Sequence, residues 1–515
     1  MKLMKFKPAF TACIVSMWFM TLLSGISLAS EPYPGYTLYT ASGTRTNLID
    51  LNNNVIKFWN HTRSGGYSVY LLRNGDLMRP ALSSNSTING GGAAGIVQKY
   101  SWNGTLLWEY TYSSNTIRSH HDICPMPNGN VLLIAWEVKT AAEAVAAGLN
   151  HSAVIWPDHI VEIQPSGTNG GTIVWKWHFW DHLIQDHDPT KANYGVVADH
   201  PELLDINVGS AGSGDWMHIN GISYNERLDQ IVISSHELDE VYVIDHSTTT
   251  QEAAGHTGGR YGKGGDILYR WGRPANYRAA GSQVFNVVHS SSWVPDSVPG
   301  GGHIMAFNNR EGTNASHVVE IIPPEDSAGF YSHTPGTAYG PAAPVWTYAA
   351  SGFYSTHLGG CQRLPNGNTM LAESTDRKLW EVDSLGTVVW NFSPGVEVVR
   401  VLRYGFDYPG LVGISENETV APGNFELGQN YPNPLNPVTK ITFSVPASSN
   451  VTVKIYDILG NEVKTLVDNL RKEAGSHTVL WDATDNNRKT VSSGVYFYKM
   501  TSGEFSKTMR MILTK

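Results

Sequence analysis

Histidines that open a repeated hairpin pattern are the side chains of this sequence best suited to chemistry. His121 opens residues 121–133, where an Asn-Gly pair separates two apolar runs, and His357 opens a nearly identical segment, residues 357–371. Because Asn-Gly tolerates the positive φ angles of a tight turn, each segment predicts two antiparallel strands with a histidine at the start of the first. An imidazole titrates near neutral pH and can act as a nucleophile, a base or a hydrogen-bond donor.

Looser copies of the hairpin pattern occur at four other places. Residues 218–233 and 289–305 begin with a histidine, whereas residues 67–77 and the degenerate residues 398–404 do not. If the copies are equivalent parts of a symmetric fold, their first strands meet at a common axis. The sequence therefore predicts one site that gathers four histidines: His121, His218, His289 and His357.

A short polar segment at residues 215–220 is expected to add a second group to this site. Strand alternation would place Trp216, His218 and Asn220 on one face. His218 and Asn220 could then both contact a ligand.

Asn309 and Arg310 stand where the second strand of the hairpin from His289 is expected to end. We expect Arg310 to bring a guanidinium to the rim of the site, and Asn309 to contact the substrate beside it. The remaining histidines of this region are expected on outer strands or loops, outside the site: His236, His246, His256 and His317.

A second repeated pattern supplies the elements that would position these residues. It is an apolar strand with a polar turn, followed by a strand that ends in tryptophan, and it closes at Trp59, Trp108, Trp175, Trp271, Trp346 and Trp390. Two strands from each pattern make a four-stranded sheet, so the alternation predicts an all-β, six-bladed β-propeller. Residues 398–404 would close the ring by pairing with strands between residues 37 and 59, which protects the last edge. The long gap before Trp271 predicts a loop at residues 181–215.

Composition and charge narrow the function classes. The 515 residues include 51 Gly and 16 Trp with 16% charged residues, which is typical of a turn-rich, extracellular all-β protein. A net charge of -9 without a long basic run argues against a nucleic-acid partner. Residues 1–29 have the charged start, short apolar run and small-residue end of a secretory signal peptide. No later stretch is long enough to predict a transmembrane span.

Two cysteines would remain after removal of the leader, which contains Cys13. Cys124 and Cys361 lie in separate repeats. The sequence therefore favours a pair of buried thiols over a disulfide.

The C-terminal part of the chain predicts a second domain. After a polar linker, short alternating strands over about 90 residues indicate a small, Ig-like β-sandwich. The expected strands are residues 439–445, 451–456, 462–466, 477–481, 494–500 and 507–513. The resulting boundaries are a signal peptide at 1–29, the propeller at 36–412, a linker at 413–423 and the sandwich at 424–515.

This C-terminal stretch resembles the sorting domains of type IX-secreted proteins. The resemblance rests on residues 431–434 (Tyr-Pro-Asn-Pro), 453–457 (Val-Lys-Ile-Tyr-Asp) and 494–496 (Gly-Val-Tyr). It implies that the type IX secretion machinery is a partner. The protein would be exported across an outer membrane and then released or attached to the surface.

Residues 47–402 resemble the bacterial arylsulfate sulfotransferases. The shared features are the histidine followed by a Pro-Asn-Gly-Asn turn, the Asp-Trp-x-His-x-Asn element at 215–220 and the Asn-Asn-Arg element at 308–310. The resemblance implies that a sulfuryl group passes from an aryl sulfate donor to a phenolic acceptor without a nucleotide donor. It also implies a transiently sulfurylated His357 with His218, His289 and Arg310 as sulfate-binding groups. His121, Asn220 and Asn309 are expected to bind substrate, with no cofactor and no metal.

The sequence departs from the family pattern at two points. Arg310 directly follows Asn309, whereas the family's arginine usually sits a few residues beyond a turn, and residues 290–292 offer hydroxyls where an amide is expected. These departures concern the substrate class more than the fold.

Two alternatives remain open at this point. The first is a metal site built from residues 120–122 or from the His- and Asp-rich residues 181–188, although their spacing matches no ordered metal motif. The second is a non-catalytic propeller that binds sugars or surface proteins, since propellers host unrelated functions. An enzyme needs His218, His289, Arg310 and His357 around one anion-sized pocket.

Overall fold

The computed structural model describes residues 31–514 except residues 66, 86, 210–213, 311, 412–423 and 488 and the side chain of residue 476. The expected signal peptide (1–29), with Cys13, and the expected linker (413–423) lie outside the described residues. The domain boundaries stay predictions.

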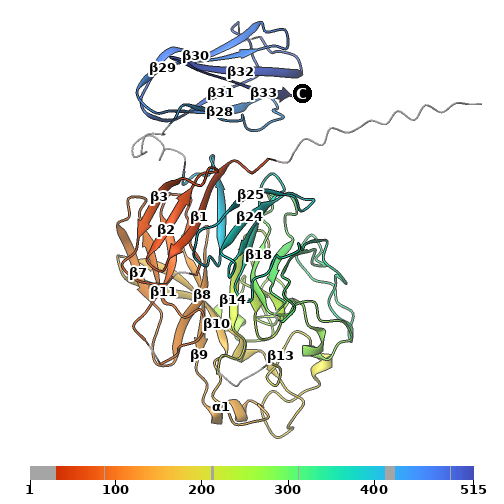
Figure 1. Ribbon diagram of the computed structural model, residues 1–515. Coiled ribbons are helices and arrows are strands. Elements are labelled where there is room, and N and C mark those ends of the chain that lie inside the picture. Colours follow the sequence, from red (N-terminus) through yellow and green to blue (C-terminus); the bar gives the residue numbers. More distant parts are fainter. Residues whose placement is uncertain are drawn as a thin grey trace, which may run out of the picture. The chain divides into compact units, whose positions relative to one another are not determined.

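The described residues between 35 and 405 form six four-stranded antiparallel sheets (Figure 1). In sheet order, the first three are β26 (Val401–Gly405), β1 (Gly35–Ser42), β2 (Arg45–Ile49) and β3 (Val55–Asn60); β4 (Tyr70–Leu71), β5 (Leu77–Leu82), β6 (Gly95–Tyr100) and β7 (Leu106–Thr111); and β8 (Ile117–Pro125), β9 (Val131–Glu137), β10 (Asp158–Ser166) and β11 (Gly170–His178). The other three are β14 (Ile219–Asn225), β15 (Gln230–Ser235), β16 (Glu240–Asp245) and β17 (Tyr269–Trp271); β18 (Val288–Trp293), β19 (Ile304–Asn308), β20 (His317–Ile321) and β21 (Trp346–Tyr348); and β22 (Gly360–Arg363), β23 (Thr369–Glu373), β24 (Lys378–Val382) and β25 (Val388–Phe392).

The hairpins expected from Asn-Gly pairs are present in the first two strands of the sheets. Gly129 turns β8 into β9 and Gly367 turns β22 into β23, each with φ of 89°. Glycine adopts this left-handed conformation without steric cost, which is why the pair sets the turn. The first strands β8, β14 and β18 are neighbours in the middle of this part of the molecule (Figure 1).

The tryptophans that close the second repeated pattern tie each sheet to the next. Each lies on the outermost strand and donates its indole N–H, as follows: Trp59 to Ser101 O (3.1 Å), Trp108 to Gly170 O (2.8 Å), Trp175 to Thr248 Oγ1 (3.1 Å), Trp271 to Pro341 O (2.8 Å), Trp346 to Ser384 O (3.1 Å) and Trp390 to Leu51 O (3.0 Å). The last bond leads from the sixth sheet back to the first. The order of the sheets is therefore cyclic, as expected of a six-bladed propeller.

Ring closure by both ends of this part is confirmed. β26 pairs with β1 from Gly35 opposite Gly405 to Tyr39 opposite Val401. The late strand thus completes the sheet that the earliest strands begin. An all-β, propeller-type fold is confirmed, and its sheets leave few exposed edges.

The long connection between β11 and β14 is a mostly irregular loop, as predicted. It contains η1 (Phe179–Asp181), β12 (Leu183–Ile184), η2 (Val197–Asp199) and β13 (Leu204–Asp205), with β12 and β13 paired in parallel. The short helices α1 (Ala141–Ala146), α2 (Thr250–Ala253) and η3 (Pro274–Tyr277) complete the loops. α1 and β13 lie at the lower end of the six-sheet part (Figure 1).

The C-terminal part forms two further sheets, and its predicted strands are confirmed. One sheet contains β27 (Glu426–Leu427), β28 (Thr439–Val445) and β31 (Gly475–Trp481), and the other contains β30 (Glu462–Lys472), β29 (Ser449–Tyr456), β32 (Gly494–Ser502) and β33 (Phe505–Leu513). Alternate residues of β28, β29 and β32 are buried in one shared apolar core. This is the pattern of an Ig-like sandwich.

Cys124 on β8 and Cys361 on β22 belong to different sheets, and both are free thiols. None of the helices in the described residues is long and apolar enough to span a membrane.

Candidate active site

The backbone is left-handed at or beside each of the four predicted histidines. The residues concerned, with their φ angles, are His121 (48°), His218 (53°), Ser290 after His289 (52°) and Leu358 after His357 (62°). Non-glycine residues rarely adopt this conformation, and where they do it often marks a functional site.

Bulges in the first strands accompany two of these positions. The β8–β9 register shifts between Ser119 and Ile123, and the β18–β19 register shifts between His289 and Ser292. A bulge bends its strand and redirects a side chain. The histidines thus leave the regular alternation of their strands at equivalent places in different sheets.

His121 and His218 are in contact. Their ring centroids lie 4.5 Å apart, and His121 is 3% exposed. Nδ1 of His121 lies 2.9 Å from Nδ1 of His120, whose Nε2 lies 2.6 Å from Oδ1 of Asp158. Burial raises the pKa of Asp158 and lowers the pKa of His120 to about 3. A buried hydrogen-bonded chain therefore supports His121 from behind.

Asp215 orients His218. Its Oδ2 lies 2.6 Å from Nδ1 of His218, and its Oδ1 accepts a 2.8 Å hydrogen bond from the indole of Trp136. A glycine run covers the two histidines, because a Cβ on Gly92 would lie 2.2 Å from the His121 ring, and one on Gly91 would lie 3.2 Å from Cε1 of His218. Only glycine fits so close to His121.

Asn309 connects His289 to the segment that carries His357. Its Oδ1 lies 2.6 Å from Nδ1 of His289, and its Nδ2 donates to the carbonyls of Ser355 (2.8 Å) and Leu358 (2.6 Å). Since the amide oxygen can only accept, Nδ1 of His289 carries the proton. Its Nε2 is then the nitrogen that can take up a further proton.

The imidazoles of His121 and His289 are neutral at neutral pH. Burial lowers the pKa of each well below its usual value, and the charges of neighbouring histidines lower it further. The charge of His357 is among those that lower the pKa of His289. These two are therefore near enough to influence each other.

His236 was expected outside the site, and this expectation is wrong. The turn after β15 places its ring 4.8 Å from that of His218 and 5.4 Å from that of His289. A row of four imidazoles results: His121, His218, His236 and His289. Sequence pattern missed His236 because it comes from a turn between the second and third strands.

His357 is exposed at the start of the last sheet. Its Nδ1 lies 2.8 Å from the hydroxyl of Thr356, and its carbonyl accepts a hydrogen bond from Ser355. Nδ1 is thereby occupied, which leaves Nε2 as the nitrogen that can meet a substrate.

Arg310 is half-buried and directs Nη1 to Nε2 of His317, at 3.0 Å. The described residues show no hydrogen bond from Arg310 to His218, His289 or His357. Its left-handed backbone (φ 53°) follows the end of β19 directly. Asn309, the residue before Arg310, contacts His289. The backbone of Arg310 is therefore one residue away from a contact with the histidine row.

A very small cavity of about 10 Å³ lies between the first strands, which is room for about one water molecule. Its lining consists of Tyr67, Ser68, His121, Asp122, Asn220, His289, Val399 and Arg400. Three of the predicted residues, His121, Asn220 and His289, therefore face one space.

Arg400 is a charged lining residue that was not among the predicted site residues. It forms a 2.9 Å ion pair with Asp122 and donates to the hydroxyl of Tyr70, which itself donates to Asp122. Burial alone would lower the pKa of Arg400, but the charge of Asp122 raises it overall. A permanent cation thus borders the cavity. The sequence pattern gave little reason to place Arg400 at the site, since residues 398–404 are the least regular copy of the repeat.

The expected common face of Trp216, His218 and Asn220 is wrong. β14 begins only at Ile219, so Trp216 and His218 precede the strand. Trp216 is buried in the core with its indole bonded to Val208 O, whereas His218 packs on His121 and Asn220 lines the cavity.

Comparison with known protein families identifies the two parts of the chain. The family described as Arylsulfotransferase (ASST) matches residues 72–388, and the one described as Secretion system C-terminal sorting domain matches residues 429–514. The chain therefore belongs to the arylsulfotransferase family. Its type IX sorting domain directs it to the cell surface or the medium. No curated protein matches the chain.

Solved structures similar to this chain have low sequence identity. A Bacteroides caccae protein of unknown function is 13% identical over 72% of this chain and 98% of its own, with a TM-score of 0.41. AztD from Citrobacter koseri is 10% identical over 87% and 98%, with a TM-score of 0.31. PorZ of Porphyromonas gingivalis, a component of the type-IX secretion system, is 9% identical over 94% and 74%, with a TM-score of 0.21.

Proposed function

We propose that this protein transfers a sulfuryl group from a phenolic sulfate ester to a phenolic acceptor through a sulfohistidine at His357, without a nucleotide donor. The observation that carries the proposal is the row of imidazoles beside a small cavity that the Arg400–Asp122 ion pair lines, joined through Asn309 to the segment of His357. Membership of the arylsulfotransferase family supports the reaction class.

The transfer takes two displacements at sulfur. Nε2 of His357 attacks the sulfur of the donor, the N–S bond forms, and the S–O bond to the aryl group breaks as the phenolate leaves with the bonding pair. The acceptor phenol then attacks the same sulfur and loses its proton to solvent, and the S–N bond breaks to restore the imidazole. In this proposal the ring proton of His357 is on Nδ1, 2.8 Å from the Thr356 hydroxyl, which leaves the lone pair on Nε2 free to attack.

The surrounding groups stabilise the transferring group. A sulfuryl group passes through a trigonal state whose three oxygens carry negative charge, as a phosphoryl group does. Arg310, His218 and His289 bind these oxygens, and Asn220, His121 and Asn309 position the substrate. His289 becomes a donor when Nε2 takes up a proton, which an anion beside it favours. Charged donors of this kind form stronger hydrogen bonds to a developing anion than neutral donors do.

Replacement of the nucleophile tests the proposal. We expect His357→Asn to abolish transfer from p-nitrophenyl sulfate to phenol, because asparagine has no comparable nucleophile. Mass spectrometry of the donor-treated wild type should show an added SO₃ on the peptide with His357. The exposed His200→Asn is the matched control and should react normally. Normal turnover by His357→Asn would exclude the covalent route.

A further inference from the structure

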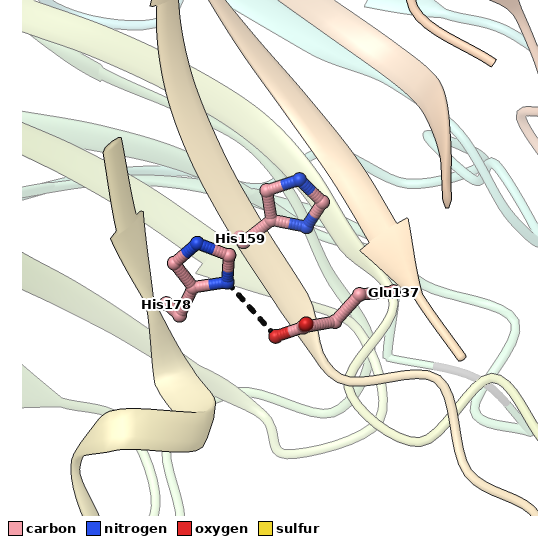
Figure 2. A group of neighbouring side chains, drawn as sticks. All are labelled: Glu137, His159 and His178. Carbon is pink, nitrogen blue, oxygen red and sulfur yellow. Dashed lines mark hydrogen bonds and ion pairs between the residues drawn. The ribbon is translucent and has the colours of Figure 1, made fainter. Parts of the chain in front are cut away.

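Three adjacent strands of the third sheet bring together Glu137, His159 and His178, none of which belongs to the histidine row. Glu137 ends β9, His159 lies on β10, and His178 ends β11 directly opposite His159. Figure 2 shows both imidazoles beside the Glu137 carboxylate. One ligand-type atom from each residue lies within 4.8 Å of the other two, and Nδ1 of His178 is 3.0 Å from Oε1 of Glu137.

His159 has a nitrogen without a partner that faces this group. The residue is 1% exposed, and its Nε2 lies 2.9 Å from the hydroxyl of Tyr112. Nδ1 is buried and has no hydrogen-bond partner in the described chain. An unpaired buried nitrogen is costly unless something binds it. In Figure 2 this edge of the ring turns toward Glu137.

The residue types of the group suit a cation. Imidazole nitrogens and a carboxylate oxygen are ligands that divalent transition metals take in proteins.

We propose that Glu137, His159 and His178 form a site for a divalent transition-metal ion of the Zn²⁺ class. The ligands are Nδ1 of His159, Nδ1 of His178 and Oε1 of Glu137, and solvent can reach the fourth position past His178, whose side chain is 25% exposed. Tyr112 fixes the outer nitrogen of His159, and Lys139 holds the other Glu137 oxygen at 2.9 Å. Hydrogen bonds from such neighbouring groups hold metal ligands in a fixed orientation.

The site differs from the metal groupings considered from sequence. It uses neither residues 120–122 nor residues 181–188. The described chain contains one other group of metal-ligand residues: His182, His256 and Asp266. Its polar atoms already have partners, because both Nδ1 atoms face Asp266 and Nε2 of His182 donates to Ala253 O. It therefore provides a matched control.

Zinc titration of the full chain tests the proposal. After treatment with EDTA, the wild type should bind one equivalent of Zn²⁺ in calorimetry, and zinc should raise its unfolding temperature. Glu137→Gln and His178→Asn, both partly exposed positions, should weaken binding at least tenfold, and Tyr112→Phe should weaken it by roughly tenfold. His256→Asn should bind zinc as the wild type does.

Cobalt gives a second readout that does not depend on stability. Co²⁺ bound by two imidazoles and a carboxylate should show visible absorption bands that disappear in His178→Asn and persist in His256→Asn. Absence of zinc binding by the wild type would overturn the proposal. So would undiminished binding by both Glu137→Gln and His178→Asn, or loss of binding in His256→Asn alone.

Discussion

Asn309 links two histidines that are far apart in the sequence. One amide accepts from His289 and donates to two carbonyls that flank His357. His289 is therefore tied to the backbone on both sides of the proposed nucleophile. The convergence of His121, His218 and His289 could be predicted, because equivalent positions of a repeat meet at its axis. The contributions of His236 and Arg400 could not, since a turn and an irregular strand supply them.

The position of Arg310 leads to a prediction at the residue scale. Arg310→Ala should lower kcat/KM for p-nitrophenyl sulfate by roughly 10²–10³, because one fixed donor to the developing charge is lost. Steady-state kinetics measures the change. Arg63→Ala removes an exposed arginine paired with Glu109 and should leave kcat/KM unchanged. An Arg310→Ala enzyme with wild-type kcat/KM would mean that Arg310 serves only His317.

At the scale of strands and turns, regular strands and Asn-Gly hairpins could be predicted from the sequence, whereas bulges could not. The strands of the C-terminal sandwich and the Asn-Gly hairpins follow from alternation and turn chemistry, which act over a few residues. The bulges at His121 and His289 depend on pairing with another strand, so no local pattern reveals them. The alternation expected around His218 failed for a different reason, because β14 begins only at Ile219.

His246 links the third and fourth sheets and gives a pH-dependent prediction. Its Nδ1 lies 2.8 Å from Asp229 and its Nε2 lies 2.9 Å from Glu162. Burial lowers its pKa, but hydrogen bonds to these two carboxylates raise the pKa overall, from 6.5 to about 9. The protonated imidazole therefore stabilises the fold by roughly 3 kcal/mol below pH 6.5, and this is lost as pH rises through about 9.

Urea unfolding of His246→Gln checks this. The free energy of unfolding should fall relative to the wild type by roughly 3 kcal/mol at pH 6, and by much less near pH 10. The exposed His200→Gln is the control and should match the wild type at both pH values. An equal loss at both pH values would contradict a charged His246.

At the scale of the molecule, the cyclic series of indole bonds leads to a prediction about ring closure. Trp390→Phe removes the donor to Leu51 O, the bond between the sixth and first sheets, while keeping most of the aromatic contact. We expect about 1 kcal/mol less stability, measured by urea unfolding. Trp102→Phe is the control, because the described chain shows no indole hydrogen bond there. A Trp390→Phe protein as stable as the control would show that closure depends on strand pairing alone.

The pairing of β1 with β26 also sets the order in which the molecule can be finished. The earliest sheet lacks one strand until residues 401–405 have been synthesised. Until then its free edge can recruit strands from other chains. Termination of the polypeptide even shortly before Val401 should therefore yield insoluble material. Only chains long enough to contain β26 can complete the first sheet and remain in solution.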